Sequence, residues 1–243
     1  MDQLHMLFLV LIGAGAGFVQ RVSGFGLGIF AMLFLPHFLP SHTAAAIAGL
    51  FSCVTSTYNA VRYRKNIAYK IALPLICAAL LCTTIAVCFS NAVPVNVFKI
   101  VLGVMLILIS VCFLVFQKGI SIKPTFTNGL IAGALGGTLN GLFSTGGPPV
   151  VLFLSSATND NITYFATIQF YFGVVNLYAA IMRGLNGVIN IYVLLFAVIG
   201  IVGCVVGDFV GRKVFNRLNT KRLKKIIYIG MILSGAIMLL QNL

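Results

Sequence analysis

Two glycine-rich stretches carry the residues whose types and spacing are best suited to binding chemistry. They are Gly13–Gly28, GAGAGFVQRVSGFGLG, and Gly133–Pro149, GALGGTLNGLFSTGGPP. When the second is laid over the first with a shift of 120 residues, Gln20 matches Asn140. Together they hold about half of the 25 glycines. We interpret them as paired helix breaks that expose backbone polar groups inside a membrane, rather than as glycines that only pack helices together.

A half-helix that begins at such a break presents free backbone N–H groups and the positive end of its dipole, and both features suit an anion. Pro148 and Pro149 fit the first turn of a half-helix, where no N–H bond is lost. The residues at the two breaks that we expect to bind an anionic substrate are Gln20, Arg21, Ser23, Gly24, Gly26, Asn140, Ser144, Thr145, Gly146 and Gly147.

Arg21 is the most informative of these residues. A charge inside a membrane is costly and normally has a partner or a function. The chain has only three acidic residues, and we expect all three, Asp2, Asp160 and Asp208, to lie near surfaces. An oxyanion substrate would supply the missing partner through fork-like hydrogen bonds. The alternative is that Arg21 lies nearer an interface and snorkels towards water.

Further polar residues lie within the expected spans, where the alternatives are substrate binding and helix–helix contact. We add four of them to the predicted site: Tyr58, Gln169, Tyr171 and Asn176. Arg62 and Arg183 end corresponding spans, and we interpret both as interfacial anchors. Asp208 is expected to balance Arg212, one helical turn away.

The composition indicates an integral membrane protein. Hydrophobic residues make up 60% of the chain and charged residues 8%, whereas soluble domains carry about 25% charged residues. The apolar runs are long enough for helices and lack the alternation of barrel strands. The net charge of +13 is concentrated in Arg62–Lys70, Lys118–Lys123 and Arg212–Lys225, at the ends of apolar runs. This pattern is typical of cytoplasmic loops and argues against nucleic-acid binding.

The expected elements repeat after half the chain. Half-spans at 4–19 and 27–39 flank the first break, and spans follow at 43–61, 71–89 and 97–116. Half-spans at 126–139 and 150–157 flank the second break, and spans follow at 163–182, 189–210 and 223–243. We therefore predict an all-α polytopic bundle of two membrane repeats, 1–117 and 126–243, joined by a basic cytoplasmic linker, 118–125.

The charges predict how the repeats are oriented. The basic loops 62–70 and 212–225 should both be cytoplasmic. They reach the same side only if the second broken element returns to the side from which it entered, as a re-entrant hairpin or a pair of short spans. Each half then makes three net crossings, which inverts the repeats and places both termini outside. Inverted repeats with broken helices are typical of secondary transporters that work by alternating access.

The same residues carry a family resemblance that covers essentially the whole chain. The segments GAGFVQRVSGFGLG and GGTLNGLFSTGGPP, with YNAVRYRKN after the next span and GDFVGRKVFNRLNTKRLKK before the last helix, resemble the sulfite exporter TauE/SafE family. This family is also called the 4-toluene sulfonate uptake permeases. The resemblance implies secondary transport of a sulfur-containing or organic anion, such as sulfite, a sulfonate or sulfoacetate, across the inner (cytoplasmic) membrane, coupled to protons.

The alternatives to a transporter are an anion channel and a non-transporting membrane scaffold or intramembrane enzyme. Catalysis has little support, because the chain has no HExxH or GxSxG motif and no Cys/His set with metal-ligand spacing. The shortage of acids argues against a cation pathway. We expect no catalytic residue, no metal, no cofactor and no nucleic-acid partner. The expected partners are a small anion and the lipid bilayer, and homo-oligomerisation is left open.

Overall fold

A computed structural model describes residues 3–90, 93–115, 122–214 and 220–242. These residues form α-helices, with short 3-10 turns and no strand, which confirms the all-α fold class. In order, the helices are α1 (Gln3–Ser23), α2 (Leu27–Phe34), α3 (Ser41–Arg62), α4 (Tyr69–Ser90), α5 (Val95–Val115), α6 (Phe126–Phe143), α7 (Gly147–Ala157), α8 (Asn161–Leu185), α9 (Ile191–Val214) and α10 (Thr220–Asn242). By length and apolar composition, five of the described helices could cross a membrane, namely α1, α3, α4, α8 and α9.

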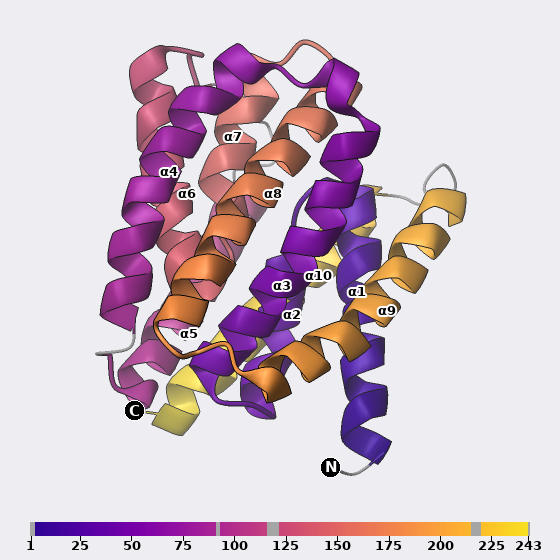
Figure 1. Cartoon of the computed structure of the whole chain (residues 1–243), viewed down its shortest axis with the longest axis vertical. Coiled ribbons are helices and arrows are strands. Elements are labelled where there is room, and N and C mark those ends of the chain that lie inside the picture. The colour runs from indigo at the N-terminus through magenta and orange to yellow at the C-terminus, as the bar shows by residue number, and fades with distance from the viewer. Residues whose placement is uncertain (1–2, 91–92, 116–121, 215–219, 243) are drawn as a thin grey trace.

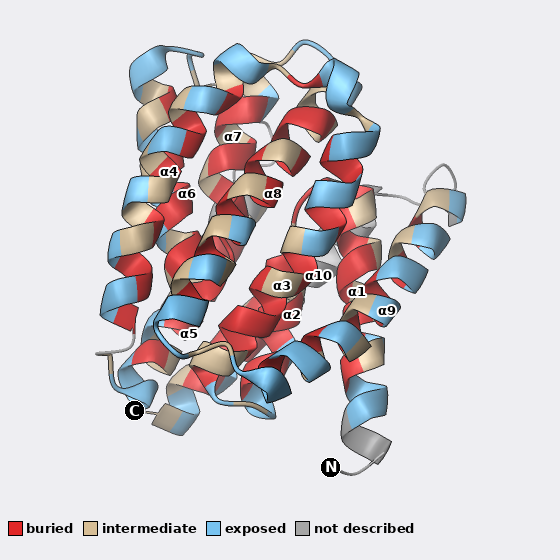
Figure 2. Ribbon diagram, in the orientation of Figure 1, coloured by how far each residue is buried: buried red, intermediate tan, exposed pale blue. Residues whose placement is uncertain are grey.

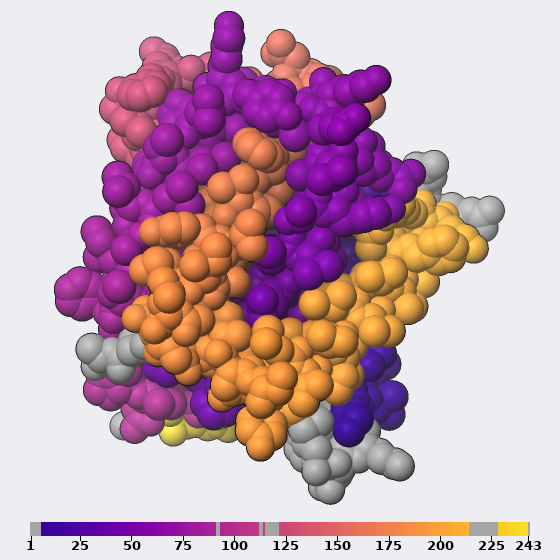
Figure 3. Space-filling model, in the orientation of Figure 1, coloured from indigo at the N-terminus to yellow at the C-terminus, as the bar shows by residue number. Residues whose placement is uncertain are grey.

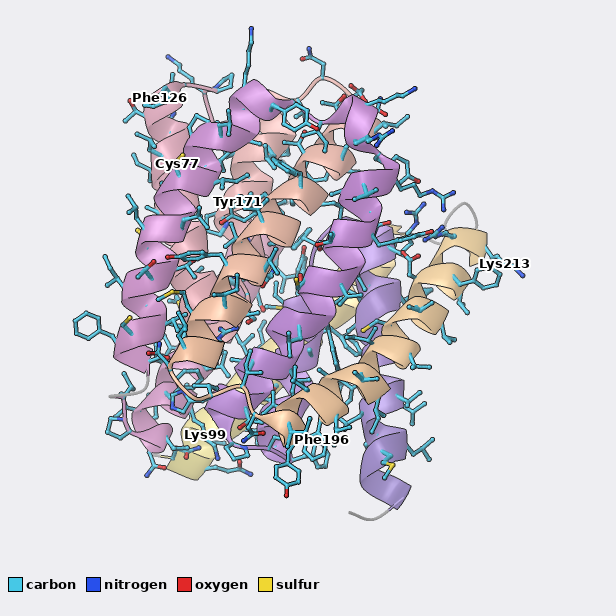
Figure 4. All side chains as sticks on the ribbon, viewed as in Figure 1. Cys77, Lys99, Phe126, Tyr171, Phe196 and Lys213 are labelled. Carbon is cyan, nitrogen blue, oxygen red and sulfur yellow. The ribbon has the colours of Figure 1, made fainter. Side chains whose placement is uncertain are left out.

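The two ends of the bundle differ in what they carry. The start of α1 and the end of α10 lie at one end, which we call the terminal end, and the basic connection between α3 and α4 lies at the opposite, basic end (Figure 1). Lys99 lies towards the terminal end, whereas Phe126, the first residue of α6, lies at the basic end (Figure 4). The first half of the predicted linker 118–125, and the side chains at 214–225, lie outside the described residues.

Each predicted break joins a long helix to a short one that folds back along it. A Cβ atom added at Gly15 of α1 would lie 2.4 Å from the ring of Phe30 in α2, and one at Gly129 of α6 would lie 3.3 Å from the ring of Phe153 in α7. The α1–α2 hairpin enters the bundle from the terminal end and the α6–α7 hairpin from the basic end (Figure 1).

The breaks are shorter than the sequence suggests. The half-spans predicted at 4–19 and 126–139 are wrong at their far ends, because α1 continues to Ser23 and α6 to Phe143. The reason is that the earlier glycines pack helices together. A Cβ at Gly17 would lie 2.2 Å from the carbonyl oxygen of Cys204 in α9, and one at Gly137 would lie 2.4 Å from that of Ala79 in α4. Such close backbone approach is the usual function of small residues in membrane helices.

Each main helix pair joins one helix from the first half of the chain to one helix from the second half. Helix α1 packs along α9 and α6 along α4, while α3 packs on α8 and α5 on α10. Since α1 and α6 hold the same place in the two halves, as do α9 and α4, a two-fold relation between the halves would produce this exchange. The buried faces of α3 and α8 turn towards the interior (Figure 2), and on one face α8 lies between α4 and α3 (Figure 3). These two helices therefore form the frame for both breaks.

The Gly137→Ala substitution is expected to destabilise the protein by about 1–3 kcal/mol, the usual cost of overpacking. The added methyl group has no room because it meets the backbone of α4. Thermal unfolding in detergent measures the effect as a lowered midpoint. Gly184→Ala on α8 is the matched control, because nothing lies within 4 Å of its Cβ position. Equal midpoints for the two variants would contradict the packing role of Gly137.

Candidate functional site

The first break needs glycine and is held by amide side chains. Gly24 and Gly26 have φ angles of 80° and 100°, which L-residues rarely adopt, and they end α1 so that α2 begins at Leu27. Gln169 of α8 donates from Nε2 to the carbonyl oxygen of Gly24 at 2.9 Å. Gln20 in turn donates from its own Nε2 to Oε1 of Gln169 at 3.1 Å.

Gln20 is buried, and its amide group is fully occupied. Besides Gln169, it donates to the Ser56 hydroxyl at 2.8 Å and accepts from the Thr55 hydroxyl at 2.8 Å. These bonds tie the last turn of α1 to both α3 and α8. The predicted residues Gln20 and Gln169 are thus brought together, and in this conformation they hold the break in place.

The second break is built differently. Ser144 has a left-handed backbone, with φ of 56°, and its N–H caps α6 by donating to the carbonyl oxygen of Asn140 at 2.9 Å. The Ser144 hydroxyl donates to the carbonyl oxygen of Ala45 in α3 at 2.8 Å. Helix α7 then begins at Gly147 and carries prolines at the next two positions. These prolines have no N–H to leave unpaired, as expected for a first helical turn.

Asn140 and Asn176 hold the second break to the centre of the bundle. Asn140 donates from Nδ2 to Oδ1 of Asn176 at 3.2 Å, and Asn176 donates to the Ser52 hydroxyl at 3.1 Å. The Asn140–Asn176 contact is the counterpart of the Gln20–Ser56 contact, since Asn140 lies 120 positions after Gln20 and Asn176 lies 120 positions after Ser56. The Oδ1 atom of Asn140 is buried and has no hydrogen-bond partner among the described residues.

The two breaks touch each other. A Cβ at Gly28, in the first turn of α2, would lie 1.9 Å from the carbonyl oxygen of Ser144. One at Gly147, the first residue of α7, would lie 3.2 Å from the ring of Phe25. Because each contact joins the start of one short helix to a residue of the other break, the two breaks meet inside the bundle.

A small cavity lies where the breaks meet. It has a volume of about 10 Å³ and is lined by the first residues of α2, by Gln20 and Ser52, and by Ser144, Thr145 and Gly147. Space of this size accommodates about one water molecule. The first N–H groups of α2 have no acceptor within their own helix, whereas Pro148 and Pro149 leave α7 with fewer donors. The donor groups therefore come mainly from α2.

Arg21 points away from this cavity into a larger pocket, which we call the vestibule. The vestibule has a volume of about 380 Å³ and is lined by Arg21, Val22, Ser23, Gly24, Tyr63, Asn161, Ile162, Tyr164 and Phe165. It lies beside the end of α3 and the start of α8, at the basic end of the bundle (Figure 1).

The guanidinium group of Arg21 is only partly used. Its Nη2 donates to the Tyr63 hydroxyl at 3.4 Å, which lowers the pKa of that phenol. Its central carbon lies 5.2 Å from the ring centre of Phe165, in cation–π range. The Nη1 atom is buried without a hydrogen-bond partner, and Arg21 forms no ion pair among the described residues.

The described acids are engaged elsewhere. Asp160 caps α8 by accepting from the N–H groups of Thr163 at 2.8 Å and Ile162 at 3.0 Å, and these bonds, the one from Thr163 foremost, lower the pKa of its carboxyl group. Asp208 accepts from Nε of Arg212 at 2.8 Å, as predicted. Neither carboxylate balances Arg21.

Arg183 is the charged residue at this site that sequence reasoning missed, and Ser52, Thr55 and Ser56 of α3 were not predicted there either. The prediction of an interfacial anchor is wrong, because only 4% of Arg183 is exposed. It donates from Nη1 to the Ser144 hydroxyl at 2.9 Å and to the carbonyl oxygen of Ala45 at 3.3 Å. From Nη2 it donates to the carbonyl oxygens of Asn140 at 3.1 Å and Gly141 at 2.9 Å. A cation is thus placed at the C-terminus of α6, where the helix dipole is negative.

The remaining predicted residues divide into two groups. Thr145 and Gly146 lie at the second break, and Ser23 lies at the end of α1, where its hydroxyl donates to the carbonyl oxygen of Val19 at 2.7 Å. Tyr171 is fully buried beside Gly136 of α6, and its hydroxyl has no partner among the described residues. Tyr58 is 54% exposed and accepts from Arg62, so the structure does not bring it to the breaks.

Helices long and apolar enough to span a membrane, with two broken elements that meet inside the bundle, define a multi-pass membrane protein built for moving a solute. A family model described as "Sulfite exporter TauE/SafE" matches residues 9–238. The chain therefore belongs to the sulfite exporter TauE/SafE family, a family of membrane transporters rather than enzymes. No curated protein and no solved structure matches the chain.

Proposed function

We propose that this protein is a secondary transporter for a small anion and that it binds the anion where the two helix breaks meet. The observation that carries the proposal is the contact between the start of α2 and the carbonyl oxygen of Ser144. At this point the first turn of α2, whose N–H groups have no acceptor within their own helix, lies with Ser52, Ser144, Thr145 and Gln20 around one small cavity. Donors without a carboxylate suit an anion.

The size of the cavity supports alternating access rather than a continuous pore. A space for about one water molecule does not pass an oxyanion, so the hairpins must move apart for the substrate to enter. Arg21 lies in the neighbouring vestibule, where it would attract the anion. From there the anion would move to the cavity, which is lined by Gln20, the preceding residue in the chain. The unpaired Nη1 of Arg21 is the donor that an incoming oxyanion would use.

Two inverted repeats, 1–117 and 126–243, would supply the symmetry for this motion. The exchanged helix pairs and the opposite entry of the two hairpins support that relation. In this orientation the basic end faces the cytoplasm, and both termini face the outside of the inner membrane. The vestibule then lies on the cytoplasmic side.

The proposed substrates are sulfite, sulfonates and sulfoacetate, moved together with protons. Flux of radiolabelled sulfite, of a sulfonate and of sulfoacetate into proteoliposomes, each with and without a pH gradient, tests this proposal. We expect saturable uptake that the gradient increases several-fold, and labelled anion inside should exchange against unlabelled anion outside. A channel would instead give flux without saturation or counterflow. Uptake of all three anions equal to that of protein-free liposomes would overturn the proposal.

A further inference from the structure

Arg183 carries a buried charge whose four hydrogen bonds all go to neutral acceptors. These acceptors come from three places: the end of α6, the hydroxyl of Ser144 in the break, and the carbonyl oxygen of Ala45 in α3. Among the described residues Arg183 forms no ion pair. A buried charge is normally compensated, and here the compensation comes from carbonyl groups in the last turn of α6, where the helix dipole is negative.

Arg183 contacts the second break from the terminal end of the bundle. It lies in the last turn of α8, which ends at the terminal end of the bundle, and Ala45 lies near the start of α3 at the same end (Figure 1). The vestibule reaches the first break from the opposite, basic end. Arg183 thus lies at the end of the bundle opposite the vestibule.

The two breaks are held in different ways at corresponding positions. Gln169 holds the first break through the carbonyl oxygen of Gly24. In the other half of the chain, Gly49 corresponds to Gln169 and Ser144 corresponds to Gly24, each at a distance of 120 positions. A Cβ at Gly49 would lie 2.7 Å from Nη1 of Arg183 and 2.9 Å from the Ser144 hydroxyl oxygen. The missing side chain at position 49 therefore leaves the space that the guanidinium occupies.

We propose that Arg183 is a positioning residue that keeps the path between the second break and the terminal end closed. It must release the end of α6 before the site can open in that direction. We call the hydrogen bonds of Arg183 to the end of α6, to Ser144 and to Ala45 the clamp. The Ser144 hydroxyl accepts from Arg183 and donates to the carbonyl oxygen of Ala45, so its proton is not free for an anion while these bonds are in place. Release of Arg183 therefore opens the path and frees a ligand donor in one step. The purpose of the clamp rests on the proposed transport function.

Thiol labelling tests the clamp without any substrate. Thr145, which lines the cavity and is buried, is changed to cysteine in a chain whose six native cysteines are replaced by alanine. A membrane-impermeant thiol reagent is applied from each face separately, and a C-terminal tag identifies the terminal face. From that face we expect Arg183→Gln to be labelled at least tenfold faster than the parent. Arg183→Lys, which keeps the charge but lacks the fork of donors, should fall between them.

Two further variants make the result decisive. Arg62→Gln removes an equal charge from the end of the corresponding helix, where Arg62 is exposed, and should label at the parent rate. Gly49→Ala displaces the guanidinium group without removing it, so the cysteine at position 145 should also be labelled faster than in the parent. This variant tests the clamp even if Arg183→Gln does not fold. Parent-like labelling of Gly49→Ala and of folded Arg183→Gln would overturn the clamp, whatever the flux assay gives. Faster labelling with no sulfite flux would leave the clamp standing and reject the proposed substrate.

Discussion

The Gly28→Ala substitution is expected to reduce anion transport by about a hundredfold while leaving the protein inserted in the membrane. The added carbon would lie 1.9 Å from the carbonyl oxygen of Ser144, where atoms of this kind never approach below 3.0 Å. The start of α2 must therefore move by about 1 Å or more away from the second break. A displacement of that size at a reacting or binding centre typically costs a factor of about 10², because the N–H groups of α2 no longer point at the substrate.

Uptake of labelled sulfite into proteoliposomes measures this effect, and size-exclusion chromatography shows whether the variant is folded. Gly230→Ala is the matched control, since it adds the same methyl group to α10 at a position with none of the described atoms within 4 Å. The control should transport at the parent rate. If Gly28→Ala transports as fast as the control, the junction of the two breaks is not the substrate site.

The sequence predicted the helices well, and it predicted which segments break, but not where. Glycines at 17 and 24 look alike in the sequence, yet the first packs α1 against Cys204 and the second turns the chain with φ of 80°. The difference lies in the neighbouring helix. Only the tertiary structure shows that α9 presents its backbone to Gly17, so the limits of a break cannot be derived from glycine content alone.

Arg183 was missed because its place at the end of a span fitted a simpler explanation. Arg62 ends the corresponding span and is exposed, as an anchor should be, whereas Arg183 turns inward to the end of α6. One signal was present. Outside the three basic clusters, the lysines and arginines of the chain are Arg21, Lys99 and Arg183. An isolated cation within a membrane protein is a functional candidate by default.

The polar residues of α8 were predicted as ligands, but the structure gives them a second task. Gln169 and Asn176 each hold one break to α8, through Gln20 and Asn140 respectively. Their amide oxygens accept these bonds, while Gln169 donates to the carbonyl oxygen of Gly24 and Asn176 donates to Ser52 and to the carbonyl oxygen of Phe172. The same side chains can therefore stabilise the closed breaks and, when the hairpins separate, offer donors to an anion, which is how one set of residues would couple binding to movement.

The Arg21→Ala substitution is expected to weaken binding of sulfite by about tenfold to a hundredfold without unfolding the protein. Arg21 has a buried, unpaired Nη1 beside the vestibule, and hydrogen bonds to a charged group contribute about 1.5–3 kcal/mol, where each 1.4 kcal/mol changes the affinity about tenfold. Arg21→Lys should recover only part of the loss, because an ammonium lacks the planar fork of the guanidinium. Isothermal titration of the purified protein with sulfite gives the affinities directly.

Arg64→Ala is the control for Arg21, because it removes an exposed positive charge from the same end of the bundle without touching the vestibule. It should leave the dissociation constant within about twofold of the parent at physiological salt, where exposed charges are largely screened. A second comparison uses Tyr63→Phe, which removes the one hydrogen bond that the guanidinium group of Arg21 makes to the described residues and frees Nη2 for the anion. We expect this variant to bind at least as tightly as the parent. If Arg21→Ala and Arg64→Ala bind equally well, then Arg21 is held only by Tyr63 and Phe165 and has no part in recognising the anion.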